Sequence, residues 1–422
     1  MGIKIIIFIF TFSILSAQPE KEYQVLISKA SLYHLQKNPD RAIPLYEKAF
    51  QIQEPDALNA YKAAGVYALK DNHIKAFYFL KLALSKGWTE AQKLSEDPYF
   101  KLLKIHNSQK WKQLQDQAFT KESQFITSLT LPDLREEINH LANVEQNLRY
   151  KRAQANADSE NIKKVDNQIR ITDSMNYQKA KEIIQKYGWP KKTEIGNDGQ
   201  NNLWLIIQHA DHDVLFQKKV LKEMEKIKGT NELNLENYAF LYDRVRINLN
   251  YKQLYGTQVN WTVNGEASSF KPIEKEGQVD SRRTSMGLPL LGSYALSYGF
   301  TYDNITVEKS QQNEYEEHQY VYDLIMKAKN AYQAGKFQDV YDFYNQASMV
   351  LGGMSNEQNY DAARVFSTIA LKTNEQKYKE IALDFLNLLY VREMLNKDML
   401  LKCNDFKILY NEERWKNLFN KL

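Results

Sequence analysis

The chain has 422 residues, of which 43% are hydrophobic and 12% aromatic, with only 16 Gly and 9 Pro. A chain of this length is expected to form two or three packed domains, and its low Gly and Pro content excludes a disordered or fibrous protein. The 56 basic and 52 acidic residues nearly balance and leave a net charge of +4. This balance argues against nucleic acid as a partner.

Residues 1–17 have the features of a secretory signal peptide. Lys4 supplies a positive charge, Ile5–Leu15 form an apolar stretch too short to span a bilayer, and Ser16-Ala17 offers small residues for cleavage. We therefore expect an exported protein, periplasmic or secreted. We also expect no integral membrane span once the signal is removed.

A period of 34 residues relates two segments near the N-terminus. Small, aromatic and turn-forming residues recur at this spacing: Ala30 and Ala64, Tyr33 and Tyr67, Asn38 and Asn72, Ala42 and Ala76, Ala49 and Ala83. The period predicts stacked helical hairpins over residues 22–53 and 58–86. The order of small and aromatic residues resembles the tetratricopeptide repeat. That resemblance implies a scaffold that binds a protein or peptide partner.

Both ends of the chain share a further pattern. Phe100–Leu103 precedes Trp111 near the N-terminus, and Phe406–Leu409 precedes Trp415 near the C-terminus. Because a terminal repeat needs its apolar face covered, each pattern is expected to close a repeat array. We therefore expect repeat regions over residues 22–118 and 316–422. The second region has small and aromatic residues at nearly the offsets of the first repeat: Ala328, Ala331, Val340, Tyr344 and Ala347.

The central block, residues 119–306, does not repeat the 34-residue period. Charged helices are expected over residues 132–155 and 160–187. Gly188-Trp189-Pro190 ends the second helix, because Gly adopts a left-handed conformation easily and Pro cannot continue a helix. A loop is expected over residues 195–199.

Two further helices and one β-hairpin complete this block. One helix starts near Asn202, and another is expected over residues 234–248, capped by its first residue. Residues 255–263 alternate in polarity, and Asn264-Gly265 then predicts a tight turn into a second strand. The expected fold class is mainly α, with helix-turn-helix repeats flanking a central α+β domain that holds one β-hairpin.

A set of short motifs falls in order along the central block: Gly188-Trp189-Pro190, Gln208–Asp211, Phe216-Gln217, Asp243-Arg244, Gln253–Gln258, Arg283 and Gly287–Leu290. These motifs resemble the uncharacterised domain-of-unknown-function family 6624 over about residues 130–300. The resemblance implies a shared fold and a shared site, but it implies no activity. One departure is Glu145-Gln146, where similar proteins have Asp-Gln, so the carboxylate here has a longer reach.

Six polar side chains fall within ten positions of this block: Gln208, His209, Asp211, His212, Asp213 and Gln217. If one helix continues through the segment, His209 and Asp213 share a face and could bind a divalent metal with a third ligand from elsewhere. If the helix breaks near Asp211, Asp213 caps a new helix from Val214. In a third interpretation, His209 is a general base polarised by an acid.

Other candidates follow further along the chain. The pair Asp243-Arg244 is either structural, with Arg binding a carboxylate or loop carbonyls, or it presents Arg244 to a ligand carboxylate or phosphate, as Arg283 also could. Tyr255 and Gln258 begin the hairpin, where they would form the rim of a pocket. The candidate ligand-binding residues are therefore His209, Asp211, Asp243, Arg244, Tyr255, Gln258 and Arg283.

No signature of a hydrolase elbow, a phosphate-binding loop, a dinucleotide fold or a zinc protease is present in the sequence. We therefore assign no catalytic residue, metal or cofactor, and we expect an exported bacterial scaffold that binds a protein or peptide partner. The alternative is a hydrolase-like enzyme or a small-ligand receptor with a polar site in the central domain.

Overall fold

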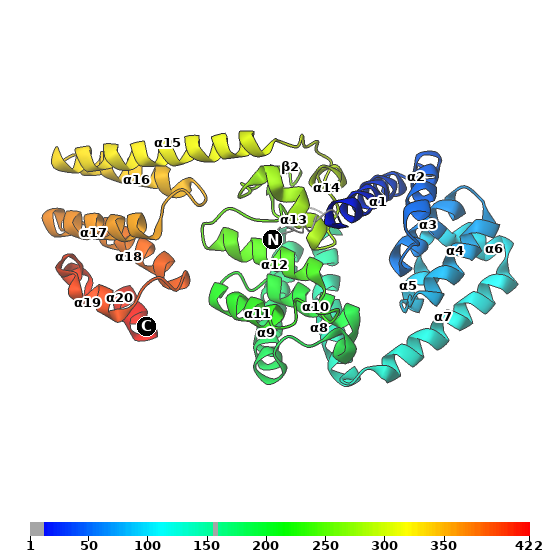
Figure 1. Cartoon of the computed structure of the whole chain (residues 1–422). Coiled ribbons are helices and arrows are strands. Elements are labelled where there is room, and N and C mark those ends of the chain that lie inside the picture. The colour runs from blue at the N-terminus through cyan, green and yellow to red at the C-terminus, as the bar shows by residue number, and fades with distance from the viewer. Residues whose placement is uncertain (1–11, 155–158) are drawn as a thin grey trace, which may run out of the picture.

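The computed structural model describes residues 12–154 and 159–422. The described part is mainly α-helical and contains one two-stranded sheet, as expected from the sequence. Figure 1 shows a central group of helices with an N-terminal and a C-terminal group on either side of it. Most of the expected signal segment, residues 1–11, lies outside the described residues. Among the helices that are described, none combines the length and apolar character needed to cross a bilayer.

The N-terminal group, residues 12–128, consists of two helical hairpins and a closing segment. Its helices are α1 (Phe12–Leu35), α2 (Pro39–Ile52), α3 (Ala57–Leu69), α4 (His73–Ser85), α5 (Ala91–Glu96), η1 (Pro98–Phe100), α6 (Lys101–His106) and α7 (Ser108–Ser128). Helix α1 packs against α2, α3 packs against α4, and α2 also contacts α3. The two expected hairpins are therefore present and stacked.

The 34-residue period corresponds to equivalent positions in these hairpins. Asn38 and Asn72 each cap the second helix of a hairpin, where they accept the backbone N–H of Arg41 and Lys75 respectively. The recurring alanines are buried: Ala30, Ala42, Ala49, Ala64, Ala76 and Ala83. Because alanine has a short side chain, the helix axes can approach closely at these positions.

The C-terminal group, residues 307–422, has the same construction. Its helices are α15 (Val307–Gln333), α16 (Phe337–Met349), α17 (Asn356–Thr373), α18 (Gln376–Val391), α19 (Lys397–Lys402), η3 (Asn404–Leu409) and α20 (Glu413–Lys421). Phe406 is fully buried and its ring centroid lies 6.0 Å from that of Trp415. In the N-terminal group, Phe100 and Trp111 form the matching contact at 5.7 Å. The two closing patterns in the sequence therefore form similar aromatic contacts.

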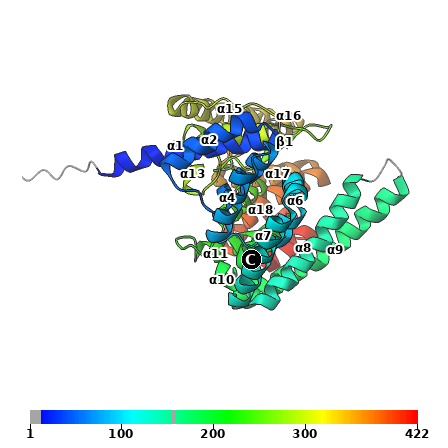
Figure 2. The ribbon, with the colours of Figure 1, turned by 90° about the vertical axis from the view of Figure 1, so that its right-hand side faces the viewer.

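The central group, residues 132–297, contains the β-hairpin. Its elements are α8 (Pro132–Gln154), α9 (Ser159–Tyr187), α10 (Lys192–Gln208), α11 (Val214–Glu225), α12 (Leu235–Asn248), β1 (Val259–Trp261), β2 (Ala267–Phe270), η2 (Glu276–Gln278), α13 (Val279–Ser285) and α14 (Leu291–Ser297). Figure 2 shows that α8 and α9 form a long antiparallel pair that projects from the group. The strands pair antiparallel, with a bulge between Asn260 and Trp261.

One sequence expectation in this group is wrong. Residues 195–199 belong to α10 and do not form a separate loop. The helix is instead kinked at Gly196, whose φ of 75° and ψ of 173° are not helical. Asp198, just after the kink, forms an ion pair with Arg135 on α8 at 2.7 Å. This tertiary contact helps to hold in place a segment whose Gly and Asn content favours a loop.

Hydrogen bonds join the C-terminal group to the end of α12. The buried Arg392 donates through Nε to the carbonyl of Leu249 at 2.9 Å and through Nη2 to the carbonyl of Asn250 at 3.2 Å. Asn250 in turn donates through its side chain to the carbonyl of Ser348 at 3.0 Å. On the other side, α1 contacts α14. Both flanking groups therefore contact the central one.

Candidate ligand-binding site

A cavity of about 460 Å³ opens in the central group between α10, α12 and the β-hairpin. Residues at helical spacing line it: Trp204 and Gln208 on α10, and Phe240, Arg244, Ile247 and Asn248 on α12. The remaining lining residues are Asp211, Thr257, Gln258, Val259, Trp261, Lys271 and Tyr298. Neighbours three or four positions apart share one face of a helix, so each helix presents one face to the cavity. We call this space the central cavity.

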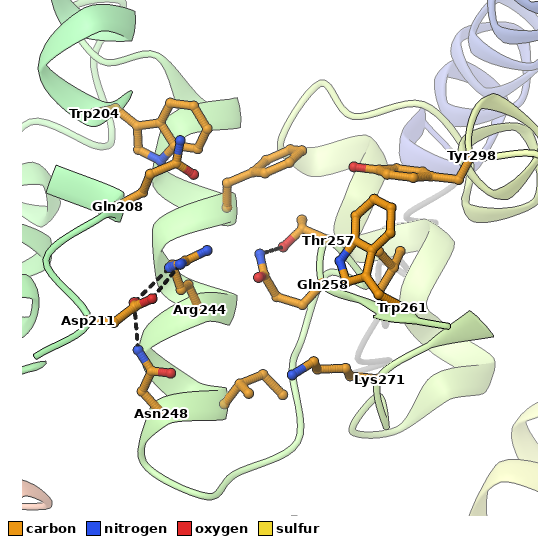
Figure 3. Close-up of a pocket in the computed structure, with 13 residues that line it drawn as sticks. Trp204, Gln208, Asp211, Arg244, Asn248, Thr257, Gln258, Trp261, Lys271 and Tyr298 are labelled. Carbon is orange, nitrogen blue, oxygen red and sulfur yellow. Dashed lines mark hydrogen bonds and ion pairs between the residues drawn. The ribbon is translucent and has the colours of Figure 1, made fainter. Parts of the chain in front are cut away.

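One end of the central cavity is aromatic. Trp204 and Phe240 meet edge to face, with ring centroids 5.8 Å apart at an interplanar angle of 85°. Trp261 and Tyr298 form a second edge-to-face pair at 5.9 Å and 72°. The residue Trp261 is 61% exposed, although it carries one of the largest apolar side chains in the protein. Figure 3 shows Trp204 and the Trp261–Tyr298 pair on facing sides of the space.

The other end of the central cavity is polar and is organised around Asp211. Arg244 donates through Nε to Asp211 Oδ1 at 2.7 Å, and its Nη2 pairs with Asp211 Oδ2. Asn248, one turn further along α12, donates to Asp211 Oδ1 at 2.9 Å. Burial alone would raise the pKa of Asp211, but the hydrogen bonds and charge of Arg244 outweigh burial and lower it. Asp211 is therefore an ionised anchor for Arg244.

The position of Asp211 follows from a break between two helices. Helix α10 ends at Gln208, and α11 begins at Val214 with Asp213 as its cap, accepting the N–H of Phe216 at 3.0 Å. This confirms the second interpretation of the polar segment, a corner with a capping aspartate. The corner directs Asp211 toward α12, so a structural turn also supplies a side chain of the site.

Gln258 and Lys271 reach the cavity from the hairpin side. Gln258 Nε2 donates to Thr257 Oγ1 at 3.1 Å, and Figure 3 shows this amide facing Arg244. Lys271 Nζ points into the space and forms no ion pair with any side chain of the described residues. Lys271 is therefore a cation available to a ligand. The backbone N–H of Lys271 donates to the carbonyl of Gln258 at 3.0 Å, which fixes the two residues side by side.

Two of the candidate residues support the segment before Gln258 from behind the cavity. The fully buried Asp243 accepts the backbone N–H groups of Leu254 at 2.7 Å and Thr257 at 3.0 Å, and also that of Tyr255. The fully buried Arg283 donates through Nη1 to the carbonyl of Tyr255 at 2.5 Å. Burial lowers the pKa of Arg283 to about 10. The structure thus places Asp243, Tyr255 and Arg283 outside the cavity lining.

Gly256 lies between these two buried charges, in a conformation that few other residues adopt. Its φ is 66°, and a Cβ atom built there would lie 2.7 Å from Leu291 Cδ1. The backbone therefore needs glycine both for its left-handed conformation and for its close contact with α14. This requirement explains why the chain has Gly just before the two residues that enter the cavity.

His209 does not line the central cavity. Its Nδ1 lies 2.5 Å from Oε1 of Glu145, whose side chain is 1% exposed. Arg149 contacts the same nitrogen at 2.9 Å and donates two hydrogen bonds to Asp173. Burial would raise the pKa of Glu145, but its hydrogen bond and charge interaction with His209 lower it. Asn176 also donates to Glu145, at 3.0 Å.

This second cluster has a set of groups that could ligate a metal. One ligand atom each from Glu145, Asp173 and His209 lies within 4.8 Å of the others. The guanidinium of Arg149 contacts all three side chains, however, and it already supplies positive charge at their centre. A metal ion would have to displace Arg149, so we assign no metal site here.

A comparison with known proteins places the central cavity within a recognised segment. Residues 132–303, about two fifths of the chain, match the model of a family of unknown function (DUF6624). Searches of curated proteins and of solved structures give no match. The match supports the family resemblance of the central group. The tetratricopeptide character of the flanking groups stays a prediction, because no family model matches them.

Of the seven candidate residues, the structure brings Asp211, Arg244 and Gln258 together around one cavity. The other ten lining residues are not among those candidates: Trp204, Gln208, Phe240, Ile247, Asn248, Thr257, Val259, Trp261, Lys271 and Tyr298. Helical spacing from Gln208 and Arg244 would have found Trp204 and Asn248. Lys271 and Trp261 carry no such signal, because the bulged hairpin sets their position.

Proposed function

We propose that this protein is a receptor for a small organic ligand, which binds in the central cavity. The observation that carries the proposal is the arrangement of aromatic side chains at one end and the Asp211–Arg244 pair with Lys271 at the other. Sites for small molecules combine apolar walls with a few fixed polar groups, and they typically occupy about 300–1,000 Å³. The volume of about 460 Å³ falls in that range.

The signal-like features of residues 1–17 support an exported receptor. We propose that the protein works in the periplasm or outside the cell. Fusion of residues 1–30 to a reporter enzyme that is active only outside the cytoplasm tests this location. Reporter activity that depends on the apolar stretch Ile5–Leu15 is the expected result. Activity unchanged by charged substitutions in that stretch would contradict it.

A ligand screen tests the receptor function. Trp204 and Trp261 line the cavity, so tryptophan fluorescence of the purified full chain should report binding, and bound ligand should raise the melting temperature. The screen covers small organic acids, amides, amines and sugars. Tyr298→Ala removes part of the aromatic end and should weaken each hit about tenfold. Tyr315→Ala, at a 60% exposed tyrosine on α15, is the matched control. Hits that bind Tyr298→Ala as well as wild type would count against the proposal.

A groove in the C-terminal group favours a second function, the binding of a peptide or protein partner. The groove measures about 340 Å³ and lies mainly between α16 and α18, where it is lined by Tyr341, Tyr344, Asn345, Ile381, Phe385 and Leu388 among others. Stacked helical hairpins offer such grooves to extended chains. Leu388→Asp should weaken binding of peptides from a random panel about tenfold, whereas Leu401→Asp, at an exposed position on α19, should not. Equal peptide binding by the Leu388→Asp and Leu401→Asp variants would contradict peptide binding in this groove.

A further inference from the structure

We infer that the ligand of the central cavity is a monoanionic carboxylate carried on a flat apolar ring. The carboxylate would lie between Arg244 and Lys271, and the ring between Trp204 and the Trp261–Tyr298 pair. This inference rests on the proposed receptor function and specifies its ligand. It depends on three features of the cavity: its charge, its donors and its aromatic end.

The charge of the cavity favours a single negative charge on the ligand. Asp211 and Arg244 neutralise each other through two contacts, and Asn248 occupies a further acceptor position on the carboxylate. Lys271 forms no ion pair within the described part of the chain, so it leaves one unit of positive charge. A carboxylate balances this charge. A phosphate dianion would leave one negative charge unpaired in a partly desolvated site, which is unfavourable.

The free donors of the cavity fit a carboxylate in position as well as in charge. Arg244 uses Nε and Nη2 on Asp211, and its Nη1 forms no hydrogen bond with the described residues. Figure 3 shows the guanidinium between Asp211 and Gln258, with Lys271 Nζ pointing into the same space from the hairpin. Hydrogen bonds from a cationic donor to a carboxylate are about twice as strong as neutral ones. Asp211 holds Arg244 in place, so little side-chain freedom remains to be lost on binding.

The aromatic end requires a flat apolar group. Trp261 exposes 61% of its surface beside Tyr298, and a ring placed against the pair would remove this apolar area from water. Aromatic faces also attract the edges or faces of other rings. The cavity thus presents ring-binding surface at one end and donors at the other. A ligand with its carboxylate a short spacer away from a ring matches both.

The test titrates the purified full chain with three probes by calorimetry. They are 3-phenylpropionate, its neutral amide, and phenyl phosphate, so the ring is common and the polar group varies. We expect the carboxylate to bind at least tenfold more tightly than the amide and more tightly than the phosphate. Added salt should weaken binding of the carboxylate and leave binding of the amide nearly unchanged.

Variants assign this preference to the cavity. Lys271→Met should abolish the preference for carboxylate over amide, and Lys271→Arg should restore most of it. Lys110→Met, at an exposed position on α7, should behave like wild type. Circular dichroism verifies that each variant is folded.

The outcomes separate this inference from the receptor proposal. If carboxylate and amide bind wild type equally, or if Lys271→Met keeps the preference, the inference is overturned while the receptor stands. If the phosphate binds most tightly, the monoanion assignment is wrong. If the carboxylate probe does not bind at all, the inference fails, and the broader screen then decides on the receptor.

Discussion

Asp243 and Arg283 form hydrogen bonds with the two backbone polar groups of a single residue, Tyr255. Tyr255 donates its backbone N–H to the buried carboxylate at 3.0 Å, and its carbonyl accepts a hydrogen bond from the buried guanidinium at 2.5 Å. Neither charged side chain lines the central cavity. Together they fix the backbone conformation of residues 254–257, and this conformation places Thr257 and Gln258 at the cavity. The two charges thus act on the site through the backbone.

Asp243→Asn is expected to destabilise the protein. The amide cannot accept hydrogen bonds at both positions, so a buried N–H group loses its acceptor. The expected loss is about 3 kcal/mol, in the range for breaking a buried charged interaction. Urea unfolding followed by circular dichroism measures it. Asp398→Asn removes the carboxylate of an exposed ion pair with Lys402 and should change stability by less than about 1 kcal/mol. Equal effects would show that Asp243 is not a structural anchor.

Gly256→Ala should be more damaging than Gly265→Ala. Both glycines have a positive φ, so alanine costs roughly 1 kcal/mol at either position. A Cβ atom at Gly256 also meets Leu291 at 2.7 Å, whereas none of the described atoms lies within 4 Å of a Cβ at Gly265. The overlap should add about 1–3 kcal/mol. Thermal unfolding of both variants gives the difference, and equal melting temperatures would contradict the packing of this segment.

The Asp211–Arg244 pair predicts a loss of stability in acid. Burial opposes the charge of Asp211, but Arg244 holds the pKa of this carboxyl below its ordinary value of 3.8. Between the two values the unfolded chain binds more protons than the folded one, so stability falls as pH falls through this window. Asp211→Asn should therefore be less stable than wild type at about pH 6, and the difference should shrink at about pH 3. Urea unfolding at both pH values checks this, and a constant difference would contradict the assignment.

The buried Glu145 should stabilise the fold without contributing to ligand binding. Glu145→Gln weakens the contacts with His209 and Arg149 and should cost about 3 kcal/mol. Asp166→Asn, which removes an exposed ion pair between Asp166 on α9 and Arg152 on α8, should cost less than about 1 kcal/mol. Ligand affinity should be unchanged in both variants, because neither residue lines the central cavity. A marked loss of affinity in Glu145→Gln would connect the His209 cluster to the site.

The equivalent caps of the two N-terminal hairpins give a test of the repeat. Asn38→Ala and Asn72→Ala each remove a side-chain acceptor at the start of a helix, and each should cost about 1 kcal/mol. Glycine at the same positions should cost only a few tenths of that amount. Similar losses in the two alanine variants, measured by urea unfolding, are expected for repeat positions. If either alanine variant were as stable as wild type, the two caps would not be equivalent repeat positions.

Local signals explain why much of the helical architecture could be predicted. The cap Asn234 and the helix end at Gly188 depend on neighbours within four residues, and the structure has each in the expected role. The kink at Gly196 was missed because its stabilising contacts come from α8, far away in the sequence. Local composition there indicates a loop, and tertiary packing overrides it.

The site could be predicted only in part for the same reason. Asp211 and Arg244 stand in polar motifs, so their chemistry is visible in the sequence. Lys271 and Trp261 enter the cavity because of strand pairing and a bulge, and neither is evident from a short window of residues. The partner of His209 was also hidden, since Glu145 and Arg149 come from a different helix.

The hydrogen bonds of Arg392 bear on whether the family-matched segment can exist alone in this protein. Excising residues 132–303 would remove the guanidinium that satisfies the carbonyls of Leu249 and Asn250. These carbonyls follow the last turn of the helix that carries Arg244, where backbone acceptors have no partner within the helix. In the whole chain Arg392 satisfies these acceptors, so an isolated fragment would have to expose them to water at a surface that the C-terminal group covers.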